Sequence, residues 1–302
     1  MIRLAVRVRR AQAELVLAEL LELAPDGVEE SRIGEETVEY AVYGAPGELP
    51  SLPDLQAAAG EALVEISTSE TADDWQERWK RFHRPVLIAA PQSRGQPLAG
   101  TRSTVPALHG RPPWEAPGSE LDGRAEEIVI DPGQAFGTGG HASTRLCLQL
   151  LLELAAFDPR RGPLLDVGTG SGVLAIAAAR LGFAPVLALD HERESVEAAR
   201  ANACANGAQM EVRRFDLRRH ALPWPQERAA PAPGMIVLAN LLRPLLLDLA
   251  GSMADAPAHL LAGGLLREQV EEIVEAFAGG LGLRERGRRA SGEWAAVWLS
   301  AP

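Results

Sequence analysis

The residues best suited to chemistry surround a glycine-rich segment near the middle of the chain. The sequence Leu-Leu-Asp-Val-Gly-Thr-Gly-Ser-Gly ends at Gly172 and joins an apolar stretch to an alanine-rich one. Glycine lets a ligand approach the backbone without a Cβ in the way, and the N-terminus of a following helix offers unpaired N–H groups. Asp190 comes 18 residues later, at the end of the next apolar stretch, where a carboxylate can accept hydrogen bonds from both hydroxyls of a ribose. This spacing predicts a nucleoside-binding site.

The spacing of the glycines also indicates which nucleoside is bound. Gly168, Gly170 and Gly172 form Gly-x-Gly-x-Gly, whereas dinucleotide folds prefer Gly-x-Gly-x-x-Gly because pyrophosphate sits on the helix end. Asp166 lies two residues before Gly168 and suits positive groups on a ligand better than it suits pyrophosphate. The segment resembles the first motif of class I methyltransferases, whose cofactor S-adenosylmethionine carries an ammonium, a sulfonium and a ribose. A dinucleotide-dependent oxidoreductase is therefore the least favoured enzyme.

Three further polar residues are candidates for the same site. Asn240 closes the apolar run 235–239, where ligand contacts gather in open α/β sheets, and its amide oxygen can accept from an amine. Asp216 follows the expected strand 210–215, where class I methyltransferases often contact adenine, although a turn or helix cap is an equally good interpretation. His141 is the nearest candidate for a general base, but a loop histidine bonded to backbone is the commoner case.

The elements that must position these residues alternate in type from residue 126 onward. We expect strands at 126–130, 163–167, 185–189, 210–215 and 235–239, and helices at 144–156, 173–181 and 193–206. This alternation predicts βαβ units and a parallel-rich sheet covered on both faces. Gly263-Gly264-Leu265-Leu266 runs at once into Arg267-Glu268-Gln269, so we expect a shortened strand beside Asn240.

The first 70 residues have another pattern. We expect strands at 2–8, 28–33, 37–43 and 63–67 and helices at 11–23 and 54–62, which is the β-α-β-β-α-β order of a ferredoxin-like α+β sandwich. This segment contains 5 arginines and 14 acidic residues, and so carries a charge of −9 out of −11 for the chain. An acidic surface attracts basic partners and repels nucleic acid. Solubility alone explains such a charge equally well.

Residues 71–125 separate these two patterns. Trp75, Trp79 and Phe82 recur at helical spacing, so we expect a helix over 71–84 whose aromatic face packs on a neighbouring domain. An aromatic patch that faces the substrate is the alternative. Residues 91–117 are rich in Pro, Gly, Ser and Arg and are interpreted as a linker or long loop. We therefore predict a recognition domain at 1–70, a helix and linker at 71–125, and a catalytic domain at 126–302.

The composition excludes several classes of protein. With 302 residues, 46% of them hydrophobic and 24% charged, the chain has the balance of an ordinary soluble protein, and it has no apolar run of the length of about 18 residues that a membrane span needs. Cys147 and Cys204 are the only cysteines; they fit a reducing cytoplasm and lack metal-ligand spacing. We expect a cytoplasmic protein with no bound metal, no membrane contact and no direct contact with nucleic acid.

One family combines these motifs in this order. Asp-Pro-Gly-Gln-Ala-Phe-Gly-Thr-Gly begins at Asp131, after the Trp-rich segment and Arg-Pro-Pro-Trp-Glu at Arg111, and before the glycine loop and Ala-Asn-Leu at Asn240. Over nearly its whole length the chain resembles the bacterial ribosomal protein L-eleven (L11) methyltransferase family. The resemblance implies a class I methyltransferase with a Rossmann-like, parallel-rich α/β sheet, preceded by a small ferredoxin-like domain that presents the substrate.

The same resemblance implies a reaction and a set of site residues. The family transfers methyl groups from S-adenosylmethionine to lysine side-chain and N-terminal amines of ribosomal protein L11, which we expect to be free or not yet fully assembled. Thr144, Gly168, Asp190 and Asn240 match the family's cofactor positions, and Gly170 joins them as part of the glycine loop. No catalytic residue is identified. Two alternatives stay open: a related methyltransferase with another protein or small-molecule substrate, and a cofactor-binding protein that has lost turnover.

Overall fold

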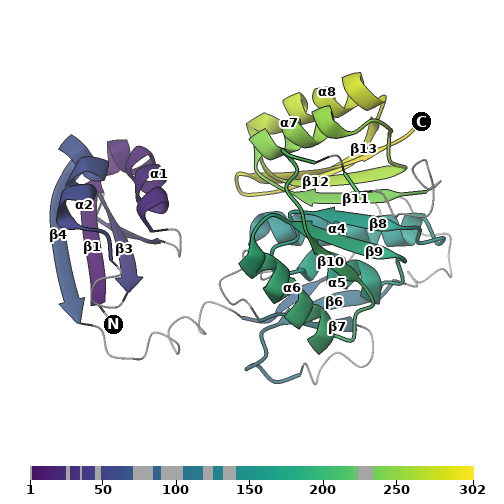
Figure 1. Cartoon of the computed structure of the whole chain (residues 1–302), viewed down its shortest axis with the longest axis horizontal. Coiled ribbons are helices and arrows are strands. Elements are labelled where there is room, and N and C mark those ends of the chain that lie inside the picture. The colour runs from purple at the N-terminus through teal and green to yellow at the C-terminus, as the bar shows by residue number, and fades with distance from the viewer. Residues whose placement is uncertain are drawn as a thin grey trace. The chain divides into compact units, whose positions relative to one another are not determined.

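A computed structural model describes residues 2–24, 28–34, 36–44, 49–70, 84–89, 105–117, 125–131, 141–220, 222–223 and 234–302. The expected aromatic helix over 71–84 and most of the glycine-rich segment 131–143 lie outside these ranges. The chain forms two compact units, Met1–Phe82 and His83–Pro302 (Figure 1). The boundaries expected at residues 70 and 125 stay predictions. None of the helices within the described ranges has the length and apolarity that crossing a bilayer requires.

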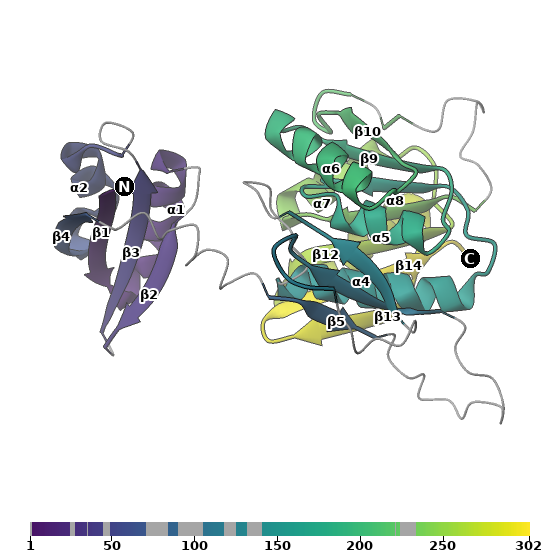
Figure 2. The same ribbon diagram turned by 90° about the horizontal axis from the view of Figure 1, so that it is seen from below.

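The first unit is the expected split βαβ sandwich. Its elements are β1 (Ile2–Arg9), α1 (Ala13–Leu23), β2 (Glu29–Ile33), β3 (Thr37–Gly44), α2 (Leu52–Ala59) and β4 (Leu63–Glu70). The strands form one antiparallel sheet in the order β2-β3-β1-β4 (Figure 2). Alternate residues of β1, such as Leu4, Val6 and Val8, are buried with apolar residues of both helices, as the period of a half-buried strand requires.

The other face of this sheet carries paired charges. Glu39 on β3 accepts from Arg3 Nη2 and Arg7 Nε, both at 2.6 Å, and only 5% of Glu39 is exposed. The Arg3 hydrogen bond, helped by Arg7, lowers the pKa of Glu39. Glu39 is therefore a structural acid of the sheet, whereas Glu30 and Glu36 are exposed to solvent.

The second unit is built on a seven-stranded sheet in the order β10-β9-β8-β11-β12-β14-β13. Its strands are β8 (Leu164–Val167), β9 (Val186–Asp190), β10 (Glu211–Arg214), β11 (Ile236–Asn240), β12 (His259–Leu266), β13 (Arg284–Ser291) and β14 (Trp294–Ser300). The first five strands in this order are parallel, and β14 is antiparallel to β12 and β13. The predicted parallel-rich α/β sheet is confirmed.

Helices cover both faces of this sheet. Residues of α4 (Ala142–Phe157), α5 (Val173–Arg180) and α6 (Arg193–Ala205) share one core with it, and residues of α7 (Arg243–Ser252) and α8 (Val270–Leu281) share the other (Figure 1). Every residue of β8 and β9 is buried, because helices cover both faces of the sheet. Apart from Asp166 and Asp190, these residues are therefore apolar rather than alternating. The glycine loop emerges from β8, at the centre of the sheet.

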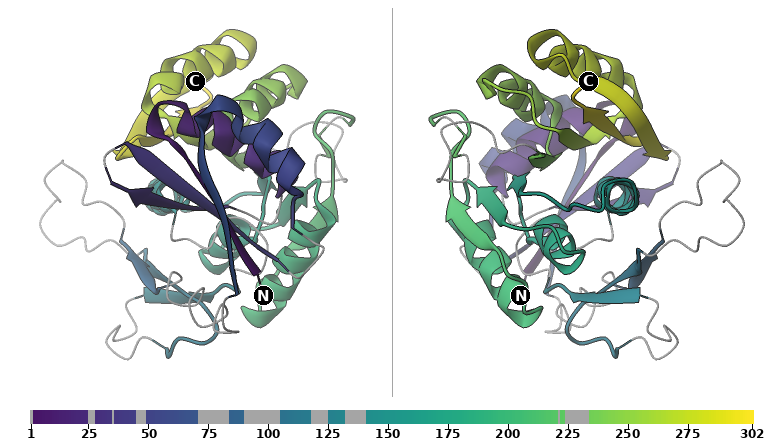
Figure 3. Two further views of the ribbon diagram at one scale, coloured as in Figure 1. Left: turned by 90° about the vertical axis from the view of Figure 1, so that its left-hand side faces the viewer. Right: turned by 90° about the vertical axis from the view of Figure 1, so that its right-hand side faces the viewer.

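A smaller three-stranded sheet precedes the seven-stranded sheet in the chain. It contains β5 (Val86–Ile88), β6 (Ala107–Arg111) and β7 (Ala125–Val129), in the order β5-β6-β7, and its blue strands are visible in Figure 3. The interpretation of residues 91–117 as a linker without structure is wrong for β6. A five-residue strand is too short to show a period, and β6 is defined by its backbone pairing with β5 and β7. Arg111 Nη2 adds a bond to Glu127 Oε1 of β7 at 2.9 Å.

The expected shortening of the strand beside Asn240 is also wrong. β12 has eight residues and pairs with β11 on one side and β14 on the other. The strand does end at Leu266, where Arg267-Glu268-Gln269 forms a 3-10 turn, but it begins at His259 and is therefore of full length. Gly264 has a φ of +76°, and a Cβ on it would come within 2.5 Å of the Leu241 carbonyl oxygen. The glycine pair therefore allows the backbone after β11 to pass close to β12.

Candidate functional site

The glycine loop joins β8 to α5 and needs glycine for its backbone shape. Gly168, Gly170 and Gly172 have φ values of 75°, 54° and 85°, which side chains disfavour. A Cβ on Gly168 would lie 2.3 Å from Cδ2 of Leu241, so this position also requires close approach. The N–H groups of Gly168 and Thr169 donate to the Leu189 carbonyl at 2.8 and 2.9 Å. The loop is thus attached to the end of β9.

Asp190 is the last residue of β9 and lies beside this loop, as predicted. Its Oδ2 accepts from the Gly170 N–H at 2.9 Å, and its Oδ1 accepts from the Glu192 N–H at 3.1 Å. Only 8% of Asp190 is exposed. A carboxylate offers about four lone-pair sites, so two remain for a ligand. Two backbone donors hold this carboxylate in one orientation at the carboxyl edge of the sheet.

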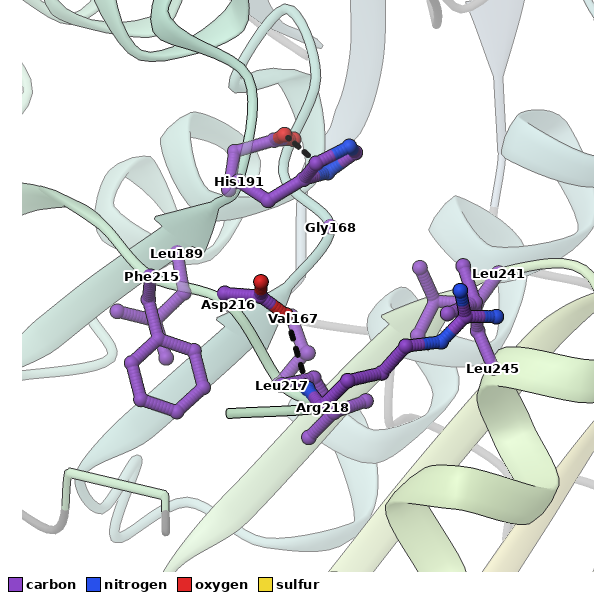
Figure 4. A pocket seen from close by; sticks show the side chains of 11 residues that line it. Val167, Gly168, Leu189, His191, Phe215, Asp216, Leu217, Arg218, Leu241 and Leu245 are labelled. Carbon is purple, nitrogen blue, oxygen red and sulfur yellow. Dashed lines mark hydrogen bonds and ion pairs between the residues drawn. The ribbon is translucent and has the colours of Figure 1, made fainter. Parts of the chain in front are cut away.

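Asp190 and Gly168 line a cavity of about 290 Å³ (Figure 4). The other lining residues come mainly from the segments that follow β9, β10 and β11: Val167, Leu189, His191, Phe215, Asp216, Leu217, Arg218, Leu241 and Leu245. Apolar walls with two fixed carboxylates, those of Asp190 and Asp216, suit a flat base attached to a ribose. Sequence reasoning missed Phe215 and Leu241, although their positions just after strand ends are a signal that could have found them. It also missed Leu245, which lies in the first turn of α7.

Asp216, proposed from sequence as an adenine contact or a cap, lies in this cavity wall. Its Oδ1 accepts from the Arg218 N–H at 3.0 Å, and its Oδ2 pairs with Arg219 Nε at 3.1 Å. The carboxylate therefore stabilises the turn after β10 and borders the cavity at the same time. An adenine contact stays a prediction.

Asn240 and Thr144 meet outside this cavity. Asn240 Nδ2 donates to Thr144 Oγ1 at 3.4 Å, which joins the end of β11 to the first turn of α4. Thr144 is buried, and Asn240 Oδ1 is buried without a hydrogen-bond partner among the described residues. A Cβ on Gly263 would lie 3.1 Å from that oxygen and 2.2 Å from Cys147 Sγ. The structure therefore brings two of the predicted cofactor residues together and leaves an acceptor open beside them.

Asp166 provides a second open acceptor on the neighbouring strand β8. Thr169 Oγ1 donates to its Oδ2 at 2.6 Å, and a backbone interaction with Ala175 also lowers the pKa of the carboxyl. Its Oδ1 is buried and has no hydrogen bond of ordinary geometry within the described ranges. Burial raises the pKa of Asp166 to about 7. Burial also raises the pKa of Cys147 to about 12, helped by the charge of Asp166, so this thiol stays protonated and is no nucleophile.

His141 caps the N-terminus of α4. Its Nδ1 accepts from the Ser143 N–H at 3.3 Å and lies 2.8 Å from Ser143 Oγ, and its ring contacts the edge of Trp294 at 4.7 Å between centroids. Because Nδ1 accepts from a backbone donor, the proton of the neutral ring sits on Nε2. Burial and the charge of Arg145 lower the pKa of His141. This geometry supports the interpretation as a capping histidine, and the catalytic residue stays unidentified.

These groups fit S-adenosylmethionine better than a phosphate-bearing ligand or a metal. Asp166 Oδ1 and Asn240 Oδ1 are acceptors that need a donor such as an ammonium, and the glycine backbone gives a ligand room to approach. The apolar cavity and Asp190 suit adenosine. No group of three or more His, Cys, Asp or Glu side chains in the described part of the chain is arranged to hold a metal ion.

Comparison with known proteins extends this result. A family model described as "Ribosomal protein L11 methyltransferase (PrmA)" matches residues 51–301. The ribosomal protein L11 methyltransferase of Syntrophotalea carbinolica is 32% identical over 276 residues, which cover 90% of this chain and 78% of that protein. The protein of the same name from Symbiobacterium thermophilum is 34% identical over 233 residues, which cover 76% of this chain and 66% of that protein.

A solved structure agrees with these relatives. The crystal structure of ribosomal protein L11 methylase from Lactobacillus delbrueckii subsp. bulgaricus has 30% sequence identity and a TM-score of 0.53, and it covers 66% of this chain and 95% of that one. The matches confirm three predictions made from sequence: a class I methyltransferase fold, a protein methyltransferase activity and S-adenosylmethionine as methyl donor. The chain belongs to the ribosomal protein L11 methyltransferase family.

Proposed function

We propose that this chain transfers methyl groups from S-adenosylmethionine to lysine side-chain amines, the N-terminal amine, or both, of ribosomal protein L11. One observation carries the assignment of the site: Gly168, Asp190 and the Asn240–Thr144 pair lie at the carboxyl edge of one parallel sheet, with buried acceptors left open. The names of its relatives support L11 as the substrate.

Five residues would hold the cofactor. The Gly168 and Gly170 backbone would pass along it, the remaining lone pairs of Asp190 would accept from the ribose hydroxyls, and Thr144 and Asn240 would border its methionine end. S-adenosylmethionine supplies an electrophilic methyl group on a sulfonium. Asp166, as a carboxylate, would stabilise positive charge near the loop.

The remaining task of the protein is to present a neutral amine. A free lysine has a pKa of about 10.4, so the site must favour its neutral form and align its nitrogen with the methyl group. A buried, apolar environment lowers an amine's pKa, and holding two reactants in line is the larger contribution expected here. His141 offers no free Nδ1 lone pair, so we assign the effect to desolvation and orientation.

We further propose that the acidic first unit captures the basic substrate, free or before full assembly, without direct nucleic acid or membrane contact, in the cytoplasm. Exposed acids such as Glu30 and Glu36 are available for this role, whereas Glu39 is held by Arg3 and Arg7. The loss-of-turnover alternative rested on a shortened strand, and β12 is not shortened.

The test is transfer of labelled methyl groups. The purified chain is incubated with labelled S-adenosylmethionine and either recombinant L11 or a whole ribosomal-protein fraction, and the labelled species is identified by mass spectrometry. We expect label on L11 amines, and much less with Asp190→Ala when S-adenosylmethionine is kept below the KM of the wild type. Label on another protein or on a small molecule would assign a different substrate, and cofactor binding without transfer would contradict the proposed activity.

A further inference from the structure

Asn202 of α6 and Asn206, the residue that caps the C-terminus of this helix, hydrogen-bond along the edge of β7. The Val129 N–H donates to Asn206 Oδ1 at 2.8 Å, and Asn206 Nδ2 donates to the Val129 carbonyl at 2.7 Å. Asn202 repeats the pattern one turn earlier: the Asp131 N–H donates to its Oδ1 at 2.9 Å, and its Nδ2 donates to the Asp131 carbonyl at 3.2 Å. The two amides therefore pair with β7 and its continuation as a neighbouring strand would.

The geometry of the two elements makes this pairing possible. Four residues of an α-helix rise about 6 Å, and two residues of a strand rise about 6.6 Å. Side chains at positions i and i+4 of the helix therefore match backbone groups at positions i and i+2 of the strand. This match explains why a polar residue, Asn202, is only 3% exposed within a helix.

Asn202 differs from Asn206 in one contact. Its Nδ2 also donates to the Ser171 carbonyl at 2.9 Å, within the glycine loop. The second bond of Asn206 Nδ2 goes instead to the Asn202 carbonyl at 2.7 Å, inside α6. Asn202 thus joins the glycine loop to Asp131, where the segment that leads to His141 and Thr144 begins.

We propose that Asn202 is a positioning residue for the cofactor site, which holds the glycine loop in the conformation that binds S-adenosylmethionine. The inference rests on the proposed assignment of Gly168, Gly170 and Asp190 to that site. A loop with three glycines at positive φ has many alternative conformations, so it needs anchors on both sides. The Leu189 carbonyl anchors its first half, and Asn202 anchors Ser171 in its second half.

We expect a variant without this anchor to bind the cofactor more weakly, because the glycine loop of the ligand-free protein adopts the binding conformation less often. When the binding conformation is only one of several, the apparent dissociation constant rises by the inverse of its population. If Asn202→Ala reduces that population to about a tenth, the Kd for S-adenosylhomocysteine rises about tenfold. The KM for S-adenosylmethionine rises in parallel, and kcat at saturating cofactor stays unchanged, because Asn202 is placed to hold the loop rather than the reacting atoms.

Asn206→Ala is the matched control, because it removes the same kind of side chain and its bonds to β7 without touching the glycine loop. Both full-length variants are examined by thermal unfolding and by calorimetry with S-adenosylhomocysteine. We expect both to lower Tm, but only Asn202→Ala to raise Kd by about tenfold, with Asn206→Ala within about twofold of the wild type.

Asn202→Asp provides a second variant should the alanine variant fail to fold. It keeps the acceptor for the Asp131 N–H but loses the amide donors, so we expect the same rise in Kd. Equal changes of Kd in the Asn202 and Asn206 variants, or no change in either Asn202 variant, would overturn the positioning role. A wild-type protein that binds no S-adenosylhomocysteine would overturn the proposed cofactor site itself, which is a distinguishable failure.

Discussion

Replacing Asp166 by Asn is expected to stabilise the ligand-free protein at high pH while weakening its binding of S-adenosylhomocysteine. The Asp166 carboxyl is fully buried, and burial raises its pKa to about 7. The hydrogen bond from the Thr169 hydroxyl lowers this pKa, but by less than burial raises it. A carboxyl that ionises less readily in the folded state than in the unfolded state destabilises the fold wherever it is ionised. Asn keeps an acceptor for Thr169 Oγ1 and removes the ionisation.

The size of the effect follows from the two pKa values. The folded value is about 7 and the ordinary value is 3.8. At about 1.4 kcal/mol per pKa unit, the difference of roughly three units sets an upper limit of about 4 kcal/mol on the penalty. The folded state binds more protons between these values, so stability falls as pH rises from about 4 to about 7 and then levels off. The advantage of Asp166→Asn is therefore absent below pH 4 and complete above pH 7.

The assay is urea unfolding of both proteins at pH 4.5, 6 and 8 without ligand. Asp158→Asn is the control, and it should lower the free energy of unfolding at pH 8 where Asp166→Asn raises it. The Arg160 side chain lowers the pKa of Asp158, so the ionised form of Asp158 stabilises the fold at that pH. For the wild type, Asp166 is mostly ionised at pH 8 and mostly neutral at pH 6, so affinity for S-adenosylhomocysteine should fall between these pH values, by up to about tenfold where only the ionised form binds. An Asp166→Asn variant no more stable than the wild type at pH 8, or one with unchanged affinity, would refute the reasoning.

Three other outcomes are expected. Asp190→Ala should weaken binding of S-adenosylhomocysteine in calorimetry by at least tenfold, since hydrogen bonds to a charged acceptor are worth about 1.5–3 kcal/mol each; unchanged affinity in a folded variant would remove Asp190 from the site. Gly263→Ala should lower the free energy of unfolding by about 1–3 kcal/mol, because its new Cβ would lie 2.2 Å from Cys147 Sγ. Adding Cys147→Ala to the same chain should restore part of this loss, and a double variant whose two losses simply add would contradict the prediction. Raising salt from about 0.1 to 1 M shortens the Debye length from about 10 to 3 Å, so it should raise the KM for L11 more than the KM for S-adenosylmethionine, and the double variant Glu30→Gln with Glu36→Gln should show a weaker salt dependence. Equal salt sensitivity of both KM values would leave the acidic unit with a role in solubility only.

Most of the site's framework could be predicted from sequence because the residues concerned obey local rules. Glycine at every second position after an apolar run indicated the loop, and an acid at the end of the next strand indicated Asp190. Both line the same cavity because the carboxyl ends of adjacent parallel strands meet at one edge. The expected elements of both units agree with the structure to within a few residues for the same reason.

What local rules missed depends on distant partners. β6 is five residues long and is defined by pairing with β5 and β7 rather than by its own period. The full length of β12 was missed because its first residues were not recognised as strand, and the reason for Gly263 and Gly264 within it is the approach of Cys147 and Leu241 from other elements. Asn202 reads as an ordinary polar position of a helix, because its hydrogen-bond partner Asp131 lies 71 residues earlier in the chain. The Asn240–Thr144 bond spans 96 residues, and only the family resemblance pointed to it.

The polar groups of the site fall into two kinds, and the difference bears on how it binds its cofactor. Asp190 and Asp216 are already hydrogen-bonded, so they are oriented before a ligand arrives and cost little to keep in place. Asp166 Oδ1 and Asn240 Oδ1 are buried without partners of ordinary geometry among the described residues, and an unmet buried acceptor costs about 1–3 kcal/mol. A ligand that brings donors to both relieves that cost, and a ligand with oxygen atoms at the same places would add to it. The site therefore favours a cationic amino-acid end over an anionic one through groups that destabilise the free protein, and the Asp166→Asn experiment measures the two sides of this balance in one variant.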